Sequence, residues 1–294
     1  MQQRQLGPNG PTVGAIGIGT GPLCIPDNRP SVQDAVQVLT HAATLGMTLW
    51  DTADAYCKDE ADMGYGDYLC QKAFAALPGE LRERVIVATK GGTVRPDNRW
   101  DRDSSPEYLK SAIDASLLAL QTDCIDLWQL HSPDGKTPFA DSIGAIAEAK
   151  QQGKIRLVGL SNVTAAQIEE AAAIVPLASI QNHFSFHSRN PEEDGVLDRC
   201  RELGLAFLPY SPLGGMNDAK DLGRTGVLAE VAKELNATPQ QTVLAWLLHK
   251  YDKMIPIPGM SRTGSLEDSA KASEIMLTDE QFEQLNAAND SKNK

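Results

Sequence analysis

Short apolar runs alternate with longer amphipathic segments along almost the whole chain of 294 residues. The runs have the length of buried strands, and the segments between them keep the apolar spacing of helices. Counted from Val13, eight such strand and helix units follow one another without a break in composition. Alternating strands and helices indicate parallel strands with right-handed crossovers, and eight units in about 250 residues predict an α/β protein built as a closed (β/α)8, or TIM, barrel. We expect residues 1–294 to form a single domain.

Turn and capping residues set the expected ends of these elements. The polar turn Gly7–Pro11 predicts a short N-terminal β-hairpin, and its second extended piece is expected to run from Val13 to Ile18 as the first core strand. The later strands are predicted at 47–51, 85–90, 125–131, 155–160, 177–183, 205–210 and 253–257. The helices are predicted from Ser31 to Gly46, at 62–77, from Ser105 to Leu120, at 139–152, after the cap Thr164, up to Gly204, at 226–235 and at 239–250, with extra C-terminal helices at 265–272 and, capped by Thr278, at 279–289.

The glycines after the first core strand argue against the main competing architecture. An open, doubly wound nucleotide-binding sheet carries the spacing Gly-x-Gly-x-x-Gly at this point. Here Gly17, Gly19 and Gly21 are each two residues apart, and the chain has no P-loop sequence. The barrel is therefore the better prediction.

Charge and cysteine content narrow the class of partner. The chain has 39 acidic and 27 basic residues and a net charge of −12, which argues against a nucleic-acid or anionic-membrane surface. The N-terminus has no apolar segment of a signal peptide, and no run approaches the length of a membrane span. We expect a cytoplasmic protein, and no sequence pattern indicates its oligomeric state. Scattered cysteines without Cys-x-x-Cys spacing are typical of a reducing compartment, and they are Cys24, Cys57, Cys70, Cys124 and Cys200.

Three predicted strands end on polar side chains at one predicted edge of the barrel. They end on Asp51, Lys90 and His131, and Tyr56 follows in the turn after Asp51. The carboxyl ends of barrel strands meet on one face, which is where barrel enzymes carry their chemistry. Because a buried unpaired charge is costly, Asp51 needs a cation, and Lys90 supplies one. We expect these four side chains to form one site.

Their chemistry suits the transfer of a proton to an oxygen. A tyrosine hydroxyl has a pKa of about 10 and is a poor acid at neutral pH. We expect Lys90 to lower the pKa of Tyr56, and Asp51 to hold the lysine charged and in place. His131 can donate a hydrogen bond to the same substrate oxygen. The set predicts proton donation to an oxygen that gains negative charge as a hydride reaches its carbon, although an Asp51–Lys90 pair could also be a purely structural salt bridge.

The segments around these residues resemble the aldo-keto reductases, in particular the bacterial-type NADPH-dependent members. Residues 51–56, 88–90 and 126–131 look like the family's catalytic segments, and 153–162 looks like its fifth-strand signature. Nearly the whole chain is covered, because the ends of the last three strands also match, at 180–182, 209–213 and 255–259. The resemblance implies a (β/α)8 barrel that binds NADP(H) in an extended form. It also implies that Tyr56 is the general acid, that Lys90 and Asp51 tune it, and that His131 orients the substrate carbonyl.

The resemblance further implies a cofactor site along the barrel mouth. Ser161, Asn162 and Gln181 would hold the nicotinamide carboxamide, and Tyr210 would stack on the ring. Arg262 would bind the adenosine 2′-phosphate, because a guanidinium binds a phosphomonoester dianion well. Small residues after Tyr210 would lie along the pyrophosphate. The remaining residues implied in cofactor binding are Gly19, Thr20, Ser211, Pro212, Leu213, Gly215, Gly259, Ser261, Asp268 and Ser269.

Two segments depart from the family pattern. Asp268 and Ser269 stand where members commonly carry Glu-Asn, so we expect altered contacts to the adenine. Gly64-Tyr-Gly-Asp67 stands where the second helix usually opens with Gly-x-Asn-Glu, which weakens the comparison for residues 57–67. Cys57 lies within this segment, and a thiol near a lysine could be acidic.

The wall of the substrate pocket is the least determined part of the site. Trp50 and Trp128 fall on the helix-facing side of their strands and are expected in the core. His183 and His187 are four residues apart, but they lie at a strand end and a loop without a carboxylate, so no metal site is expected. Loop residues that could either line the pocket or pack as loop hydrophobes are Leu23, Cys24, Trp100, Phe184 and Phe186.

The sequence therefore predicts an NADPH-dependent reductase of small aldehydes or ketones, with Tyr56 as the proton donor. Two other classes stay open. One is an NADP(H)-binding redox-sensing or regulatory protein with little turnover, which multiple turnovers would distinguish. The other is a non-redox barrel enzyme that uses Lys90 as a Schiff base, which borohydride trapping would reveal. The substrate itself is not predicted, because specificity in this fold depends on loops whose conformation the sequence does not give.

Overall fold

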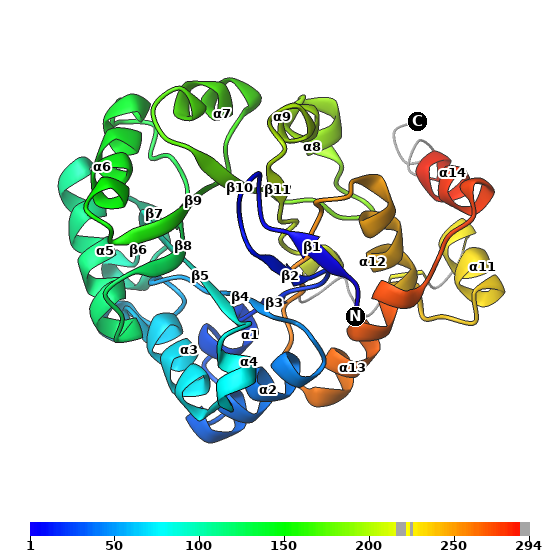
Figure 1. The fold of residues 1–294 in the computed structure, drawn as a ribbon. Helices are drawn as coiled ribbons and strands as arrows, with labels where there is room; N and C mark the ends of the chain where they lie inside the picture. The colour runs from blue at the N-terminus through cyan, green and yellow to red at the C-terminus, as the bar shows by residue number, and fades with distance from the viewer. Residues whose placement is uncertain (216–221, 224–225, 289–294) are drawn as a thin grey trace.

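A parallel sheet curls around the centre of the molecule, and helices surround it (Figure 1). The computed structural model describes residues 1–215, 222–223 and 226–288. Seven strands are hydrogen-bonded in the order β11, β10, β9, β8, β5, β4, β3. Their bounds are β3 (Ile18–Gly19), β4 (Leu49–Asp51), β5 (Ile86–Gly91), β8 (Ile125–Leu130), β9 (Ile155–Ser161), β10 (Leu177–Gln181) and β11 (Ala206–Phe207). All neighbours in this sheet pair in parallel, as the alternation of strands and helices predicts.

Residues 253–259 join the two edges of this sheet and close it into a barrel. Isolated parallel bridges pair Met254 with Phe207 of β11, and Gly259 with Gly19 of β3. On the β3 side, the carbonyl oxygens of Pro256 and Pro258 accept backbone hydrogen bonds at 2.9 and 3.0 Å. A proline has no N–H to donate, so the segment forms single bridges rather than a regular strand. The last predicted strand is therefore present in position, without a continuous ladder.

The hairpin at the N-terminus covers one end of the barrel (Figure 1). Its strands β1 (Gln3–Gln5) and β2 (Thr12–Gly14) pair antiparallel. The prediction that one strand runs from Val13 to Ile18 is wrong, because β2 ends at Gly14 and β3 begins only at Ile18. The physical reason is that Leu6 and Val13 of the hairpin are fully buried against the residues inside the barrel. This inner cluster comprises Leu6, Val13, Leu49, Ile86, Ala88, Leu127, Ala206, Leu208, Ile255 and Ile257.

The helices pack their apolar faces on the outside of the barrel and bury a second, larger core. Trp50 and Trp128 are fully buried in this outer core, which confirms that they face the helices. The predicted caps Thr164 and Thr278 each accept a backbone N–H three residues later in a capping box. The main helices are α2 (Val32–Thr44), α3 (Tyr65–Ala76), α5 (Pro106–Leu120), α6 (Phe139–Gln151), α7 (Ala165–Ala172), α9 (Val196–Leu203), α11 (Val227–Glu234), α12 (Pro239–Lys250), α13 (Thr263–Lys271) and α14 (Asp279–Ala287).

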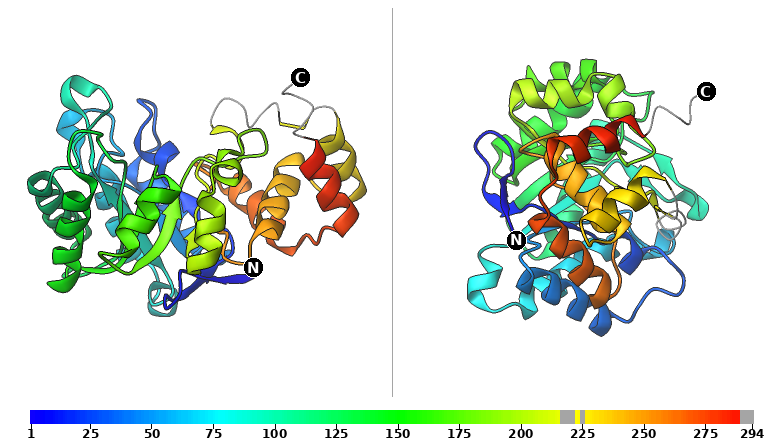
Figure 2. Two further views of the ribbon diagram at one scale, coloured as in Figure 1. Left: turned by 90° about the horizontal axis from the view of Figure 1, so that it is seen from above. Right: turned by 90° about the vertical axis from the view of Figure 1, so that its right-hand side faces the viewer.

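Several short elements lie in loops where no periodicity predicts them. Within the described ranges these include α1 (Gly21–Cys24), α4 (Gly79–Arg82), α8 (Asn190–Glu193) and the single turns Glu60–Asp62, Pro96–Asn98 and Ala272–Glu274. The hairpin of β6 (Thr93–Val94) and β7 (Asp101–Arg102) follows β5 and matters most for the site. Helices α11, α12 and α14 gather on one side of the barrel (Figure 2). No helix among the described residues combines the length and the apolar character that a membrane crossing requires.

Candidate active site

Four buried polar side chains form a hydrogen-bonded group inside the barrel, at the carboxyl ends of its strands. We call Asp51, Lys90, Gln129 and Gln181 the inner rim. Lys90 Nζ donates to Asp51 Oδ2 at 2.7 Å, and the amide nitrogens of Gln129 and Gln181 donate to Asp51 Oδ1 at 3.3 and 2.7 Å. None of the four is more than 2% exposed. The Asp51 carboxylate is thus buried with a cation and two further donors, which is the condition under which a buried ion pair is tolerated.

The pleat of the strands explains why these side chains meet. Side chains two residues apart on a strand share a face, so a polar residue at a strand end lies above the apolar residue that fills the barrel below it. Gly159 on β9 leaves the space that this group needs, because a Cβ there would lie 2.4 Å from Ser179 Oγ and 2.9 Å from Gln129 Cγ. The apolar residues two positions before Asp51, Lys90 and Gln129 are Leu49, Ala88 and Leu127, all in the inner cluster.

Tyr56 and His131 stand directly above the inner rim. Lys90 Nζ donates to Tyr56 Oη at 3.4 Å and to the carbonyl oxygen of Thr52 at 2.7 Å. The rings of Tyr56 and His131 meet edge to face, with 5.8 Å between their centroids. The structure therefore brings together the four residues that the sequence places at three strand ends and one turn, namely Asp51, Tyr56, Lys90 and His131.

The electrostatics of this group assign a protonation state to each member. Burial alone lowers the pKa of Lys90, but Asp51 and Tyr56 outweigh it and raise that pKa above its ordinary value. Burial raises the pKa of Tyr56, and the Lys90 charge offsets this only in part. The expectation of a net lowered pKa for Tyr56 is therefore wrong for the protein alone, because desolvation of the phenolate is the larger effect. Lys90 is a cation and Tyr56 a neutral phenol at neutral pH.

His131 is uncharged in the same setting. Burial, reinforced by the charges of Lys90 and Arg102, lowers its pKa to about 3. Its Nδ1 atom is buried and has no hydrogen-bond partner among the described residues, while the side chain lines a cavity. A neutral imidazole carries one N–H, so His131 can donate one hydrogen bond to a ligand. The protonated Lys90 is, by contrast, no nucleophile, and this argues against Schiff-base chemistry.

Polar groups next to this cluster form a platform at the ends of β9 and β11. Asn162 Nδ2 donates to the carbonyl oxygen of His131 at 2.9 Å, and Tyr210 Oη donates to Asn162 Oδ1 at 2.9 Å. Asn162 and Ser211 both have left-handed backbone conformations, with φ of 57° and 49°. Ser161 completes the group, since its Oγ accepts from Asn162 Nδ2 at 3.2 Å.

The other residues predicted to bind the cofactor lie at or just after the end of β3, in the segment after β11 and just before α13. Gly19 is the last residue of β3 and pairs with Gly259, where a Cβ would lie 2.9 Å from Pro22 Cγ, and Thr20 follows as the N-cap residue of α1. Arg262 is the exposed N-cap residue of α13, whose first turn contains no acidic residue. A helix N-terminus with an adjacent guanidinium can hold a phosphate. The other residues predicted for this site are Ser211, Pro212, Leu213 and Gly215 after β11, and Ser261 directly before Arg262.

Asp268 and Ser269 are tied to the neighbouring helix in this structure. The Asp268 carboxylate accepts from Gln241 Nε2 at 2.9 Å and from Thr238 Oγ1 at 3.3 Å. Ser269 is 4% exposed. The departure from the family pattern thus coincides with a carboxylate that binds the side chains of Thr238 and Gln241, the two residues of the capping box at the start of α12.

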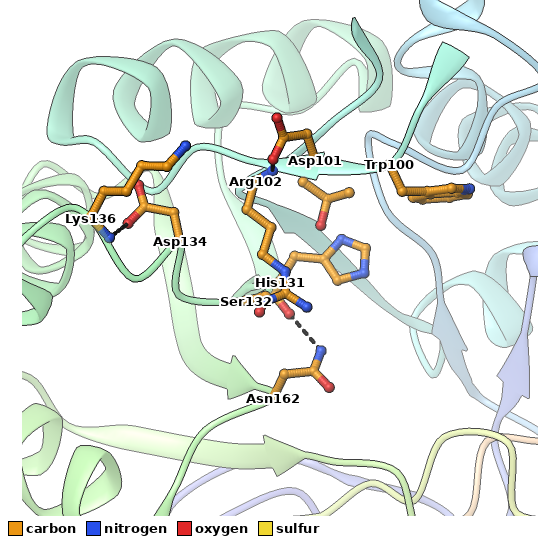
Figure 3. A pocket seen from close by; sticks show the side chains of 9 residues that line it. Trp100, Asp101, Arg102, His131, Ser132, Asp134, Lys136 and Asn162 are labelled. Atoms are coloured by element: carbon orange, nitrogen blue, oxygen red, sulfur yellow. Dashed lines mark hydrogen bonds between the residues drawn. The ribbon is translucent and has the colours of Figure 1, made fainter.

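A cavity of about 430 Å³ opens beside His131 and Asn162 (Figure 3). Trp100 lines this cavity, so of the two alternatives for this residue, lining the pocket or packing as a loop hydrophobe, the first is the one that the structure shows. The other candidates pack as hydrophobes, since Leu23, Cys24 and Phe184 are fully buried and Phe186 is 4% exposed. The remaining lining residues come from the β6–β7 hairpin and the loop after β8, and no motif marks them in the sequence: Thr93, Asp101, Arg102, Ser132, Asp134 and Lys136.

The possibility that Cys57 is an acidic thiol, because it lies near a lysine, is wrong. Cys57 is fully buried, and burial raises its pKa to about 11 despite the nearby Arg95. Its Sγ donates to the carbonyl oxygen of Ala55 at 3.3 Å. A thiol in this state is protonated and unreactive at neutral pH.

Comparison with known proteins gives one consistent result. A family model described as the aldo/keto reductase family matches residues 15–290. An uncharacterized oxidoreductase of Schizosaccharomyces pombe is 35% identical over 261 residues, which cover 88% of this chain and 80% of that protein. Another protein of the same yeast, named aldo-keto reductase yakc with NADP(+) in its name, is 33% identical over 312 residues, 95% of this chain and 89% of its own.

Solved structures agree with these sequence matches. A thermostable aldo-keto reductase in complex with the inhibitor epalrestat superposes with a TM-score of 0.82 at 30% identity, covering 98% of this chain and 100% of that one. The holo form of an aldo-keto reductase from Bacillus halodurans superposes with a TM-score of 0.79 at 26% identity, covering 98% and 96% of the two chains.

Proposed function

The chain belongs to the aldo/keto reductase family, and from this premise we propose that it reduces aldehydes or ketones to alcohols with NADPH as the hydride donor. The observation that carries the proposal is that a neutral phenol, a buried ammonium and a neutral imidazole converge, and that the imidazole of His131 lines the cavity. A carbonyl oxygen placed in that cavity against Tyr56 and His131 would face two hydrogen-bond donors at once.

Each residue has a distinct part in the reaction. A bound nicotinamide dinucleotide supplies the hydride to the carbonyl carbon. Tyr56 Oη gives its proton to the oxygen that becomes negative, and His131 stabilises the same oxygen with its single N–H. Lys90, held by Asp51, stabilises the phenolate that Tyr56 becomes, which makes a phenol with a raised pKa a usable acid.

The residues at the barrel mouth support an extended nicotinamide dinucleotide as the cofactor. The hydroxyl of Ser161 and the amide of Asn162 offer the donors and acceptors that a carboxamide needs, and the Tyr210 ring stands beside them. Arg262 at the start of α13 favours a cofactor with an additional phosphate, and the yeast relative with NADP(+) in its name supports the same choice.

A steady-state assay tests the reductase proposal. The purified protein is mixed with NADPH and benzaldehyde, absorbance at the nicotinamide band is followed, and the alcohol is quantified by chromatography. We expect many turnovers, with one alcohol formed for each NADPH consumed. A single slow oxidation of bound NADPH, with no alcohol, would contradict the proposal and favour a redox-sensing protein.

The cofactor preference has its own test. Arg262→Gln removes the guanidinium at the start of α13, so we expect the KM for NADPH to rise about tenfold, while the KM for NADH stays within about twofold. Arg99→Gln is the matched control, since this arginine is highly exposed and pairs only with Asp97 among the described residues. An equal change for both cofactors would remove Arg262 from the phosphate site.

A further inference from the structure

Arg102 places a charged group inside the cavity next to the reacting residues. It belongs to β7 of the hairpin that follows β5, and its side chain runs from the hairpin toward the part of the cavity lined by His131 (Figure 3). Its charge acts on His131 and on Tyr210. The guanidinium therefore lies within electrostatic reach of the group that would orient a carbonyl and of the ring beside the nicotinamide position.

This guanidinium has no partner in the part of the chain that the structure describes. Arg102 uses its backbone N–H for Asp101 Oδ1 at 2.8 Å, but its side chain makes no hydrogen bond or ion pair with the described residues. The ammonium group of Lys136, on the loop after β8, is equally without a described partner. Two cations thus line the cavity without committed anions.

The two carboxylates that line the cavity accept hydrogen bonds from backbone N–H groups and form no ion pair with either cation. Asp134 accepts the N–H groups of Ser104, Lys136 and Thr137, at 3.0, 2.8 and 2.8 Å. Burial opposes the effect, but these donors hold the pKa of Asp134 well below its usual range. Asp101 accepts the N–H of Arg102. Neither carboxylate neutralises the cations directly, so the guanidinium and the ammonium are available to a ligand.

We propose that the substrate of the reductase is a carbonyl compound that also carries an anionic group, a carboxylate or a phosphate, and that Arg102 binds this group. The proposal rests on the proposed reductase function and specifies its substrate class. A guanidinium matches the paired oxygens of either anion, and Lys136 adds a second positive charge on the same cavity. Trp100 offers an apolar surface for the body of the substrate, because the residue is 52% exposed while Arg95 packs on its ring, with the guanidinium carbon 4.2 Å from the ring centroid.

Matched aldehydes test the proposal directly. Benzaldehyde, 4-formylbenzamide, 4-formylbenzoate and 4-formylphenyl phosphate share a ring and an aldehyde and differ in charge. Butanal and 4-oxobutanoate repeat the comparison on a shorter, flexible chain. We expect kcat/KM to be about 10- to 100-fold higher for the anionic members, since a hydrogen-bonded charge pair has that effect. The better of the carboxylate and the phosphate identifies the anion.

Variants assign the preference to a residue. Arg102→Gln should remove most of the preference, so that the ratio of kcat/KM between 4-formylbenzoate and benzaldehyde, and between 4-oxobutanoate and butanal, falls toward one. Lys136→Gln should give a smaller loss of the same kind. Arg99→Gln is the matched control, because it removes an equal charge three residues away at a side chain that does not line the cavity. It should leave the kcat/KM ratios between anionic and neutral aldehydes unchanged. Raising the ionic strength should reduce the preference in the wild type.

The outcomes separate this proposal from the reductase function. Turnover of all aldehydes without a charge preference overturns the anionic substrate, and a preference that survives in Arg102→Gln overturns the assignment of the anion to Arg102. Both results leave the reductase intact. If no aldehyde is turned over, the reductase proposal fails, and calorimetry with benzene-1,4-dicarboxylate then tests the site itself. Binding that is lost in Arg102→Gln and kept in Arg99→Gln would still support an anion site, whereas no binding to the wild type would refute it.

Discussion

The inner rim and the hairpin side of the cavity lie next to each other, yet the charges of the first are buried and paired, whereas the cations of the second are exposed and, within the described part of the chain, unpaired. Inside the barrel, Lys90 and Asp51 are almost fully buried and satisfy one another within a closed set of hydrogen bonds. On the hairpin side, Arg102 and Lys136 are exposed and have no anion among the described residues. We call Trp100, Asp101, Arg102, Asp134 and Lys136 the outer wall.

This difference separates two tasks. A buried ion pair is expensive to disturb, so the inner rim fixes the proton donor in one geometry. An exposed charge is solvated in the free protein, so a change on the outer wall costs little stability and alters what the cavity accepts. We infer that the inner rim carries the chemistry common to all substrates, while the outer wall selects among them.

Lys90→Met should have the largest effect, because it breaks the inner rim. Without the ammonium, the Tyr56 phenolate has no counter-charge, and we expect kcat to fall by about 10²- to 10⁴-fold for every substrate. Asp51 is left as a buried charge without its cation, which should lower the free energy of unfolding by about 3–5 kcal/mol. Rates of NADPH oxidation and urea denaturation measure the two losses.

The matched control for Lys90→Met is a surface ion pair. Lys110 lies 2.6 Å from Glu148 with both side chains 49% exposed, so Lys110→Met should change stability by less than about 1 kcal/mol. Comparable losses in the two variants would contradict the distinction between a buried and an exposed pair.

The pH dependence should reflect Tyr56 alone. The active form of Tyr56 is the protonated one, and its raised pKa keeps it protonated to higher pH than an ordinary phenol. His131, with a pKa lowered to about 3, stays neutral. We expect kcat/KM for reduction to be flat from about pH 5 to 9 and to fall tenfold per pH unit only at a pH above the ordinary phenol pKa of about 10. An acid limb near pH 6.5 that persists in Asp67→Asn would mean that His131 titrates, which contradicts the pKa of about 3.

Asp67 is a buried carboxyl group close to the inner rim that, unlike Asp51, forms no ion pair with the described residues. It therefore shows what burial does to a carboxyl group that lacks a cation. Burial raises its pKa to about 6, with a hydrogen bond from Thr89 Oγ1 working against the shift. The folded state therefore holds a proton that the unfolded chain has lost, and stability falls as pH rises from 3.8 to about 6. The slope should be about 1.4 kcal/mol per pH unit.

Asp67→Asn removes this titration while keeping the shape of the side chain. Urea unfolding at pH 4, 5, 6 and 7 should show the variant gaining stability relative to the wild type as pH rises. Parallel curves for the two proteins would show that Asp67 titrates with its ordinary pKa.

Trp100→Ala should have the smallest effect, because it alters only the outer wall. The ring is half exposed, so we expect KM for aromatic aldehydes to rise by a few fold, kcat to stay constant, and stability to change by less than about 1 kcal/mol. Steady-state kinetics with benzaldehyde measure the change, and Leu118→Ala, at a position 81% exposed and absent from the cavity lining, is the control. A fall in kcat would place Trp100 in the reacting group instead.

The inner rim lies on strands and the outer wall on loops, and this difference decides which residues the sequence could place. Strand periodicity determines which face a side chain takes, so the meeting of Asp51, Lys90 and His131, and the burial of Trp50 and Trp128, follow from the order of residues. The barrel follows from the repeated units in the same way. Its closure by single bridges depends on where Pro256 and Pro258 meet β3, and the alternation of elements does not determine that.

The outer wall could not be predicted because it depends on a loop. The β6–β7 hairpin has two-residue strands and no periodicity, so nothing before the structure places Arg102 near His131. The pKa of Tyr56 was mispredicted for a related reason: the charge of Lys90 can be read from the sequence, but the extent of desolvation cannot. Leu23, Cys24 and Phe184 likewise needed coordinates, because a loop hydrophobe faces either the pocket or the core.

The central claim is that Tyr56 supplies the proton while the cofactor is held elsewhere, and Tyr56→Phe tests it most directly. The variant keeps the ring beside His131 and removes only the hydroxyl that Lys90 contacts. NADPH affinity is measured by cofactor fluorescence, and turnover with benzaldehyde is measured in the same preparation. The account predicts an affinity within about twofold of the wild type and a kcat reduced by about 10²-fold or more. Wild-type turnover in Tyr56→Phe would contradict it.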